Sequence, residues 1–358
     1  MSSNGGYLQL LLLPTLALAS GCIGGRTPLD EPDAGQAVSC TAGSVTMTRA
    51  RPTVMFVLDR SRSMTIAISA GSSQTRWQAL GSALGAVLPQ VTNAVDLGAL
   101  LFPSAESGAQ SCSVATKADL SPAAGNVAAL TKLMNSTAPD GFTPTASAID
   151  TAASVVLNVR AATTARALVL ATDGAPDCNS ALDFRTCRCA NGATGRGRCG
   201  NAEQCLDDTR TVDVISSYEA RGLPTYVIGI QSEGDTSFSG VLNAMADAGG
   251  RPKAGGGLRY YAASSEADLN AALTAVRDLV GVCTYLTTSV PDPKGHIVLK
   301  VDGSALTPDQ WTWSNLNNGE VTLLGDACLA VAAEKAPVVV AEVECASGSL
   351  RRSPHRLD

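Results

Sequence analysis

Three short segments carry oxygen-bearing side chains in a pattern that suits a hard metal ion. They read Asp59-Arg60-Ser61-Arg62-Ser63, Gly141-Phe142-Thr143-Pro144-Thr145 and Ala171-Thr172-Asp173-Gly174. Together they offer two carboxylates, Asp59 and Asp173, and three hydroxyls, those of Ser61, Ser63 and Thr143. This donor set suits Mg²⁺ and is a poor match to zinc or copper. Because Mg²⁺ usually keeps water or takes an outside ligand in such a set, the segments predict an open metal site.

Buried strands would position these segments at one edge of a sheet. Unbroken apolar runs, typical of parallel strands covered on both faces, occupy residues 54–58, 98–102, 167–171 and 226–230. Helical stripes lie between them, one over residues 77–88 and another over residues 269–280, which follows a Ser265-x-x-Asp268 capping pattern. This alternation predicts an α/β fold with a doubly wound, mostly parallel sheet. Asp59 and Asp173 each follow a strand, at the carboxyl edge where such sheets bind ligands.

Composition and charge argue against several functional classes. The chain has 26 basic and 32 acidic residues and a net charge of -6, which is unlike a broadly basic nucleic-acid binder. Its two histidines, His296 and His355, lie near the C-terminal end, so a Ser-His-Asp hydrolase has almost nothing to work with. No G-x-x-x-x-G-K-S loop occurs, and no G-x-G-x-x-G follows the first strand, which leaves nucleotide binding without support. We therefore expect no catalytic residue, no nucleic acid and no nucleotide.

In this order and at these strand ends, the three motifs resemble the metal-ion-dependent adhesion site of the von Willebrand factor A family. The resemblance implies that Ser61 and Ser63 are direct ligands of the ion and that Thr143 joins them when the site engages a partner. It also implies that Asp59 and Asp173 hold the ion directly or through water. In that family the ion, Mg²⁺ or in its place Mn²⁺ or Ca²⁺, binds an Asp or Glu carboxylate of a partner protein, and catalysis is not expected.

Two features near the motifs are particular to this chain. Arg62 stands where many members of the family have glycine, and its bulk and charge bear on the conformation of the loop. Residues 178–205 form an insertion rich in Gly and Cys, which leaves the strand that carries Asp173. We expect the insertion beside the metal, where four arginines would favour an acidic partner: Arg185, Arg188, Arg196 and Arg198. A solvated loop stapled for protease resistance is the alternative.

The N-terminus indicates export. Residues 7–19 are nearly all apolar but too few to span a bilayer, which takes about 20 residues in a helix. They run into Leu18-Ala19-Ser20-Gly21-Cys22, and small residues before a cysteine resemble a bacterial lipoprotein signal, in which that cysteine is acylated. Ile23, rather than Asp, follows the cysteine and favours the outer membrane. We expect a lipid anchor on Cys22 as the only membrane contact; a simple secretory signal, leaving the protein periplasmic or secreted, is the alternative.

Eleven cysteines indicate an oxidising compartment. If Cys22 is acylated, the other ten can form five disulfides. Since the two ends of the resembled fold are usually close, we expect Cys40 to pair with Cys283, and we expect Cys328 to pair with Cys345. The remaining six form a group around the insertion: Cys112, Cys178, Cys187, Cys189, Cys199 and Cys205. Zinc held by Cys187, Cys189, Cys199 and Cys205 is the alternative there.

The predicted domain organisation follows these signals. The ranges are a signal peptide at 1–21, a flexible tether at 22–44, the von Willebrand factor A-like domain at 45–283, a small β module at 284–346 and a disordered tail at 347–358. The β module has strand-like runs at 296–301, 320–324 and 338–343 and no visible helical period. It resembles a module found after the A domain in cysteine-rich exported bacterial proteins of the family. Trp311 and Trp313 are expected to pack in its core rather than to form a recognition surface.

Two functional hypotheses follow. In the first, the protein is anchored in the envelope and binds a partner's carboxylate through Mg²⁺. In the second, it is an envelope scaffold that binds its partner without metal, through the insertion or the β module. The intact set of five oxygen-bearing positions favours the first hypothesis.

Overall fold

The computed structural model describes residues 40–92, 95–104, 111–159, 165–190, 199–278, 280, 283–291, 295–316, 319–333 and 337–345. The predicted signal peptide, Cys22, most of the tether and the C-terminal tail lie outside these ranges. None of the helices in these ranges combines the length and the apolar character that a membrane span requires.

A six-stranded sheet forms the centre of the larger domain. Its strand order is β5 (Leu120–Ala123), β4 (Asp96–Phe102), β3 (Thr53–Asp59), β6 (Arg166–Thr172), β7 (Thr225–Ile230) and β8 (Tyr261–Ala263). All neighbouring pairs are parallel except β4 and β5, which are antiparallel. The four apolar runs of the sequence are β3, β4, β6 and β7, and every residue of β3, β4 and β7 is buried. The predicted mostly parallel sheet is confirmed.

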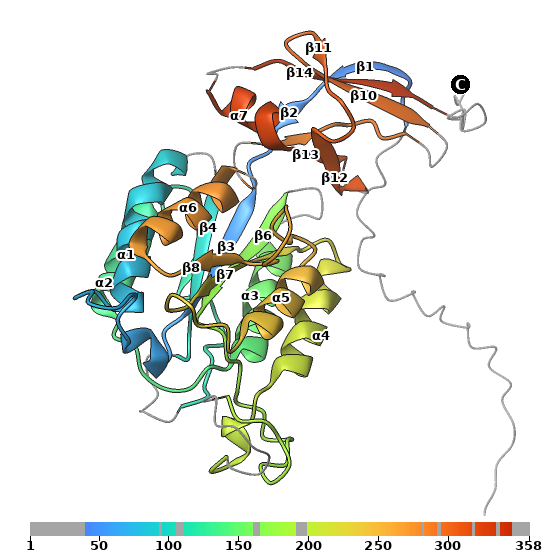
Figure 1. Cartoon of the computed structure of the whole chain (residues 1–358). Coiled ribbons are helices and arrows are strands. Elements are labelled where there is room, and N and C mark those ends of the chain that lie inside the picture. The colour runs from blue at the N-terminus through green and yellow to red at the C-terminus, as the bar shows by residue number, and fades with distance from the viewer. Residues whose placement is uncertain are drawn as a thin grey trace, which may run out of the picture. The chain divides into compact units, whose positions relative to one another are not determined.

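Helices cover both faces of this sheet (Figure 1). One face carries α1 (Arg76–Val87), α2 (Val127–Ser136) and α6 (Glu266–Arg277), and the other carries α3 (Thr145–Val159), α4 (Asp208–Glu219) and α5 (Ser239–Ala248). Side chains alternate along β3 accordingly: Phe56 and Leu58 belong to the core under α1, whereas Met55 and Val57 belong to the core under α3. Two apolar layers therefore enclose the sheet, as the doubly wound prediction requires.

Side-chain caps set where two of the helices begin. The predicted cap of α6 is present, since the Ser265 hydroxyl accepts from the Asp268 N–H at 3.1 Å. At α1 the Thr75 hydroxyl accepts from the Gln78 N–H at 3.2 Å, and the Gln78 side chain accepts from the Thr75 N–H at 2.9 Å. This reciprocal capping box was not singled out in the sequence. It makes Arg76 the first residue of α1.

The smaller domain is a β module of two four-stranded sheets. One has the order β1 (Gly43–Thr46), β14 (Val339–Glu344), β10 (His296–Val301), β11 (Ser304–Ala305). The other has the order β12 (Trp311–Asn315), β13 (Glu320–Leu323), β9 (Thr284–Leu286), β2 (Thr48–Arg49). The three predicted strand-like runs are β10, β13 and β14. The rings of Trp311 and Trp313 meet edge to face, with their centroids 5.9 Å apart, and pack against the core of the module, as expected.

One helix in the β module contradicts the sequence prediction. Residues Gly325–Ala333 form α7, where no helical period was expected. The segment Gly-Asp-Ala-Cys-Leu-Ala-Val-Ala-Ala is apolar almost all round. It therefore lacks the separate apolar and polar faces by which an amphipathic helix is predicted from sequence. Ala327, Cys328 and Val331 of this helix lie in the module core.

The strand pairing inserts the α/β domain into the β module. β1 and β2 precede β3 in the chain, yet β1 pairs with β14 and β2 pairs with β9. Thr48 lies opposite Leu286 and Arg49 opposite Tyr285. The strand that leads into the α/β domain, β2, is therefore paired with the strand that follows it, β9. The predicted domain boundary at residue 45 therefore falls within β1.

Two disulfides differ from the predicted pairing. Cys40 is bonded to Cys345 and Cys283 to Cys328, with Cα–Cα distances of 6.1 and 5.1 Å, so the expected Cys40–Cys283 and Cys328–Cys345 pairs are wrong. The physical reason is the strand pairing. Cys40 precedes β1 and Cys345 follows β14, and antiparallel pairing of these strands brings the two cysteines together. Cys283 precedes β9, which pairs with β13, and α7 then carries Cys328 back over the module core.

The cysteine group around the insertion is bonded within itself, as predicted. The pairs are Cys112–Cys178, Cys187–Cys205 and Cys189–Cys199. The sulfurs of Cys187, Cys199 and Cys205 lie within 4.8 Å of one another, but each belongs to a disulfide and offers no thiolate to an ion. The zinc alternative is therefore contradicted for the oxidised protein.

Non-reducing digestion should recover peptides that join Cys40 to Cys345 and Cys283 to Cys328. The double replacement Cys40→Ser/Cys345→Ser should lower the free energy of unfolding by about 2–5 kcal/mol, measured by urea denaturation, because the bond closes a loop with a sequence separation of 305. The control Cys187→Ser/Cys205→Ser, with a separation of 18, should lower it less. A peptide joining Cys40 to Cys283 would contradict the pairing.

Candidate functional site

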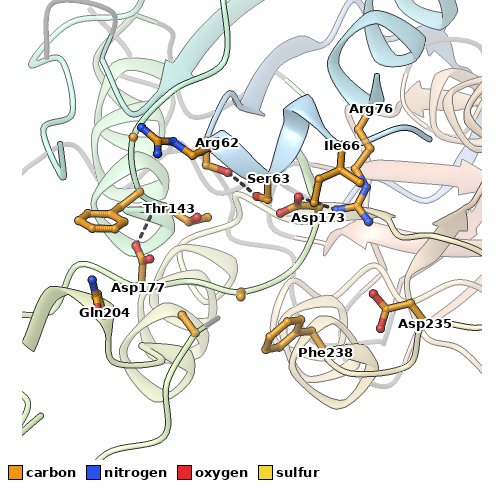
Figure 2. Close-up of a pocket in the computed structure, with 15 residues that line it drawn as sticks. Arg62, Ser63, Ile66, Arg76, Thr143, Asp173, Asp177, Gln204, Asp235 and Phe238 are labelled. Carbon is orange, nitrogen blue, oxygen red and sulfur yellow. Dashed lines mark hydrogen bonds and ion pairs between the residues drawn. The ribbon is translucent and has the colours of Figure 1, made fainter. Parts of the chain in front are cut away.

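The three predicted segments meet at the carboxyl edge of the central sheet. β3 ends at Asp59, and β6, its neighbour in the sheet, runs into Asp173. The turn before α3 supplies Thr143. A cavity of about 420 Å³ opens there, and Ser61, Ser63, Thr143 and Asp173 are among the residues that line it (Figure 2). Asp59 does not line the cavity but is fully buried and hydrogen-bonded to the segment that does.

Asp59 is held by hydrogen bonds on both carboxylate oxygens. Its Oδ1 accepts from the Ser61 N–H at 2.8 Å, and its Oδ2 accepts from the Thr172 hydroxyl at 2.6 Å. Burial, followed by the nearby charge of Asp173, raises the pKa of Asp59 to about 7, although these hydrogen bonds act in the opposite direction. The carboxylate is therefore fixed in orientation, and its negative charge is only partly compensated.

The two serine hydroxyls of the first motif lie close together. Their hydroxyl oxygens lie 3.0 Å apart, at the start of the short 3₁₀ helix η1 (Arg62–Thr65). The Ser63 hydroxyl also hydrogen-bonds Asp173. Figure 2 shows Ser63, Thr143 and Asp173 together around one part of the cavity.

Asp173 has a cationic partner that the sequence reasoning missed. Arg76 Nη1 donates to Asp173 Oδ2 at 2.8 Å, and Arg76 Nη2 donates to the Ser232 hydroxyl at 3.1 Å. Both charged side chains are more than nine-tenths buried. Burial raises the pKa of Asp173, while Ser63 and Arg76 act to lower it. Arg76 belongs to no motif, and only its place after the Thr75 cap could have drawn attention to it.

A third buried carboxylate, Asp177, was also missed. The Thr143 N–H donates to Asp177 Oδ1 at 2.6 Å, and the Asp177 N–H donates to the Thr143 carbonyl at 3.0 Å. Burial, with smaller contributions from the charges of Asp59, Asp207 and Asp173, raises the pKa of Asp177 to about 8. Asp177 lines the same cavity and fixes the backbone that presents Thr143. It lies at the root of the insertion, outside any motif.

The Arg62 side chain points away from Asp173, and Arg62 contacts the segment that leads to Thr143 (Figure 2). Its side chain is 65% exposed, and Nη2 lies 3.1 Å from Asp140 Oδ1. Its backbone N–H donates to the Gly141 carbonyl at 3.1 Å. Arg62 therefore links the first motif to the turn that carries Thr143 without entering the ligand set.

The cysteine-rich insertion lies beside the cavity, as expected. Ala190 and Gln204, joined by a hydrogen bond of 2.9 Å from the Ala190 N–H to the Gln204 carbonyl, form part of its lining. Of the predicted arginines, Arg185 and Arg188 are described, and Arg188 lies 3.8 Å from Asp208; Arg196 and Arg198 are outside the described residues. The insertion thus contributes a wall of the cavity that the central sheet does not provide.

The donor set fits a hard divalent cation. Carboxylate and hydroxyl oxygens are the ligands that Mg²⁺ and Ca²⁺ prefer. The raised pKa values of Asp59, Asp173 and Asp177 mean that gathering these carboxylates in a buried edge is unfavourable without added positive charge. His296 is the histidine among the described residues. It is the first residue of β10 in the β module and does not line this cavity.

Comparison with known proteins adds little beyond this geometry. No protein-family profile and no curated protein matches the sequence. Among solved structures, the PilB minor pilin from Streptococcus sanguinis is 14% identical, with a TM-score of 0.44 and coverage of 64% of this chain and 61% of the pilin. The vWF domain of the type V pili tip protein Mfa5 from Porphyromonas gingivalis is 11% identical (TM-score 0.40, coverage 64% and 94%). Manganese-loaded TRAP protein from Plasmodium vivax is 14% identical (TM-score 0.40, coverage 65% and 76%).

Scores this low carry no information about ligand or partner, and the chain spans less than two thirds of the pilin. The assignment of the fold therefore rests on the structure itself. The six-stranded, mostly parallel sheet covered by helices on both faces, with the three motifs at its carboxyl edge, is the arrangement that the resemblance to the von Willebrand factor A family predicts.

Stability without divalent ions should fall as pH rises from about 5.5 to 8.5. The pKa values of Asp59 and Asp177, about 7 and about 8, are raised above the ordinary value of 3.8, so the folded state binds more protons than the unfolded state in this window. The free energy of unfolding therefore decreases as these groups ionise. Carboxyls whose pKa is lowered by folding, such as Asp235 and Asp268, are already ionised at pH 5.5 and do not contribute.

Urea denaturation in EDTA at a series of pH values measures this slope. Asp177→Asn, which cannot ionise, should make the slope shallower. Stability that rises across the window in the parent protein would contradict the buried carboxylate cluster.

Proposed function

We propose that the protein is an interaction module that binds a carboxylate of a partner protein through Mg²⁺ held by Asp59, Ser61, Ser63, Thr143 and Asp173. One observation supports this above the others. Residues from three separate segments line one open cavity, the buried Asp59 accepts a hydrogen bond from the Ser61 N–H, and both Asp59 and Asp173 have raised pKa values. Mn²⁺ or Ca²⁺ could take the same place, since both also prefer oxygen ligands.

Each residue has a distinct task in this proposal. Asp59 orients the first motif by accepting the Ser61 N–H, and the serine hydroxyls present their oxygens to the cavity. Asp177 fixes the backbone of Thr143. Arg76 offsets part of the negative charge of Asp173. A bound Mg²⁺ would supply an electrophilic position that accepts an Asp or Glu from outside.

The proposed setting is the outside of the cytoplasmic membrane. Five disulfides fit an oxidising compartment. A lipid on Cys22 would hold the protein at the outer membrane through the tether, and without it the protein would be periplasmic or secreted.

A metal-independent scaffold is the second candidate. The observation in its favour is that the insertion forms a wall of the cavity through Ala190 and Gln204, so a partner in contact with the cavity also meets the insertion. If the insertion or the β module carried the affinity, partner binding would persist in EDTA.

Calorimetric titration of residues 40–345 with Mg²⁺ and Mn²⁺ tests the site directly. We expect saturable binding that is lost in Asp59→Ala and in the more conservative Asp59→Asn, because both remove a buried charge that favours the ion. Asp235→Asn is the matched control: Asp235 also lines the cavity but lies outside the proposed ligand set, so binding should be retained.

Capture of partner proteins should show the same dependence on the metal ion and on Asp59. Proteins bound in Mg²⁺ should be released by EDTA and should not bind to Asp59→Asn. If the folded, oxidised parent binds no divalent ion and captured partners stay bound in EDTA, the scaffold is favoured and the metal-dependent function is wrong.

A further inference from the structure

A buried arginine contacts one of the proposed metal carboxylates. Arg76 Nη1 lies 2.8 Å from Asp173 Oδ2, and the two side chains are 8% and 5% exposed. Figure 2 shows the Asp173 carboxylate between Ser63 on one side and the Arg76 guanidinium on the other. The Ser63 hydroxyl and the Arg76 guanidinium therefore contact the Asp173 carboxylate from opposite sides.

Several contacts hold the guanidinium in this place. Arg76 is the first residue of α1, where the Thr75–Gln78 capping box fixes the start of the helix. Its backbone N–H donates to the Ile66 carbonyl at 2.8 Å. Its Nη2 donates to the Ser232 hydroxyl at 3.1 Å, which anchors the side chain to the segment after β7. Because the guanidinium donates to both Asp173 and Ser232, it cannot move away from Asp173 without breaking hydrogen bonds in a buried site.

We infer that Arg76 is a built-in counter-cation of the metal site, which holds the Asp173 side chain in place when no ion is bound and weakens the binding of a divalent ion. This inference rests on the proposed function. The two effects have one origin, because a positive charge that stabilises a carboxylate also repels a second cation bound to it. The ion is then held firmly only when a partner's carboxylate adds negative charge.

Arg62 provides the matched comparison. It is also an arginine that lines the cavity, but it is 65% exposed and its ion pair is with Asp140, outside the ligand set. Solvent screens its charge more strongly than that of Arg76. A general effect of positive charge near the cavity would appear in both arginines, whereas a specific effect on Asp173 would appear only in Arg76.

Calorimetry with Mg²⁺ and Mn²⁺ and thermal unfolding in EDTA, on residues 40–345, test the inference in Arg76→Gln, Arg76→Lys and Arg62→Gln. Arg76→Gln should bind Mg²⁺ at least about tenfold more tightly and should unfold at a lower temperature in EDTA. Arg76→Lys keeps the charge and should stay near the parent in affinity. Arg62→Gln breaks an exposed ion pair with Asp140 and should not tighten Mg²⁺ binding. If Arg76→Gln does not fold, Arg76→Met replaces it, because it retains the apolar stem.

A merely structural ion pair would lower the unfolding temperature without tightening metal binding. Equal or weaker Mg²⁺ binding by a folded neutral variant, or equal tightening in Arg62→Gln, would therefore overturn the inference. If neither the parent nor the neutral variant binds a divalent ion, the proposed function itself fails, and the inference fails with it.

Discussion

The structure depends on the burial of negative charge at the ends of two neighbouring parallel strands. Asp59 ends β3 and Asp173 follows β6, and pairing of these strands brings the two carboxylates, each less than one-tenth exposed, to one edge of the sheet. Each surrounding contact can be understood as a response to that charge: the Ser61 N–H and the Thr172 hydroxyl on Asp59, and the Arg76 guanidinium on Asp173. The raised pKa values show that these contacts compensate the charge only in part.

The sequence predicted the central sheet and the grouping of the motifs because both are local signals. A strand buried on both faces is a continuous apolar run, and the residues that follow it lie at the carboxyl edge. Arg76 and Asp177 were missed because their contacts with Asp173 and Thr143 join segments distant in the chain. No spacing rule connects the first residue of α1 to the end of β6.

The disulfides show the same limit of sequence reasoning. The grouping of the insertion cysteines was predictable, because a segment poor in apolar residues needs cross-links to hold its shape. The partners of Cys40 and Cys283 were not, since they depend on which strands pair in the β module. Once β1 pairs with β14, Cys40 must lie near Cys345, and the bond between Cys283 and Cys328 stays within the module.

The short path from Cys40 to the cavity has a mechanical consequence. β3 begins at Thr53, soon after β2 ends at Arg49, and Asp59 is its last residue. Tension applied to the chain before Cys40, against a partner held at the cavity, would therefore run along β3 itself. β3 is paired in register with β4 on one side and β6 on the other, so the pull would act on both ladders in shear. The force is then shared among many hydrogen bonds at once, instead of breaking them one after another from the edge of the sheet.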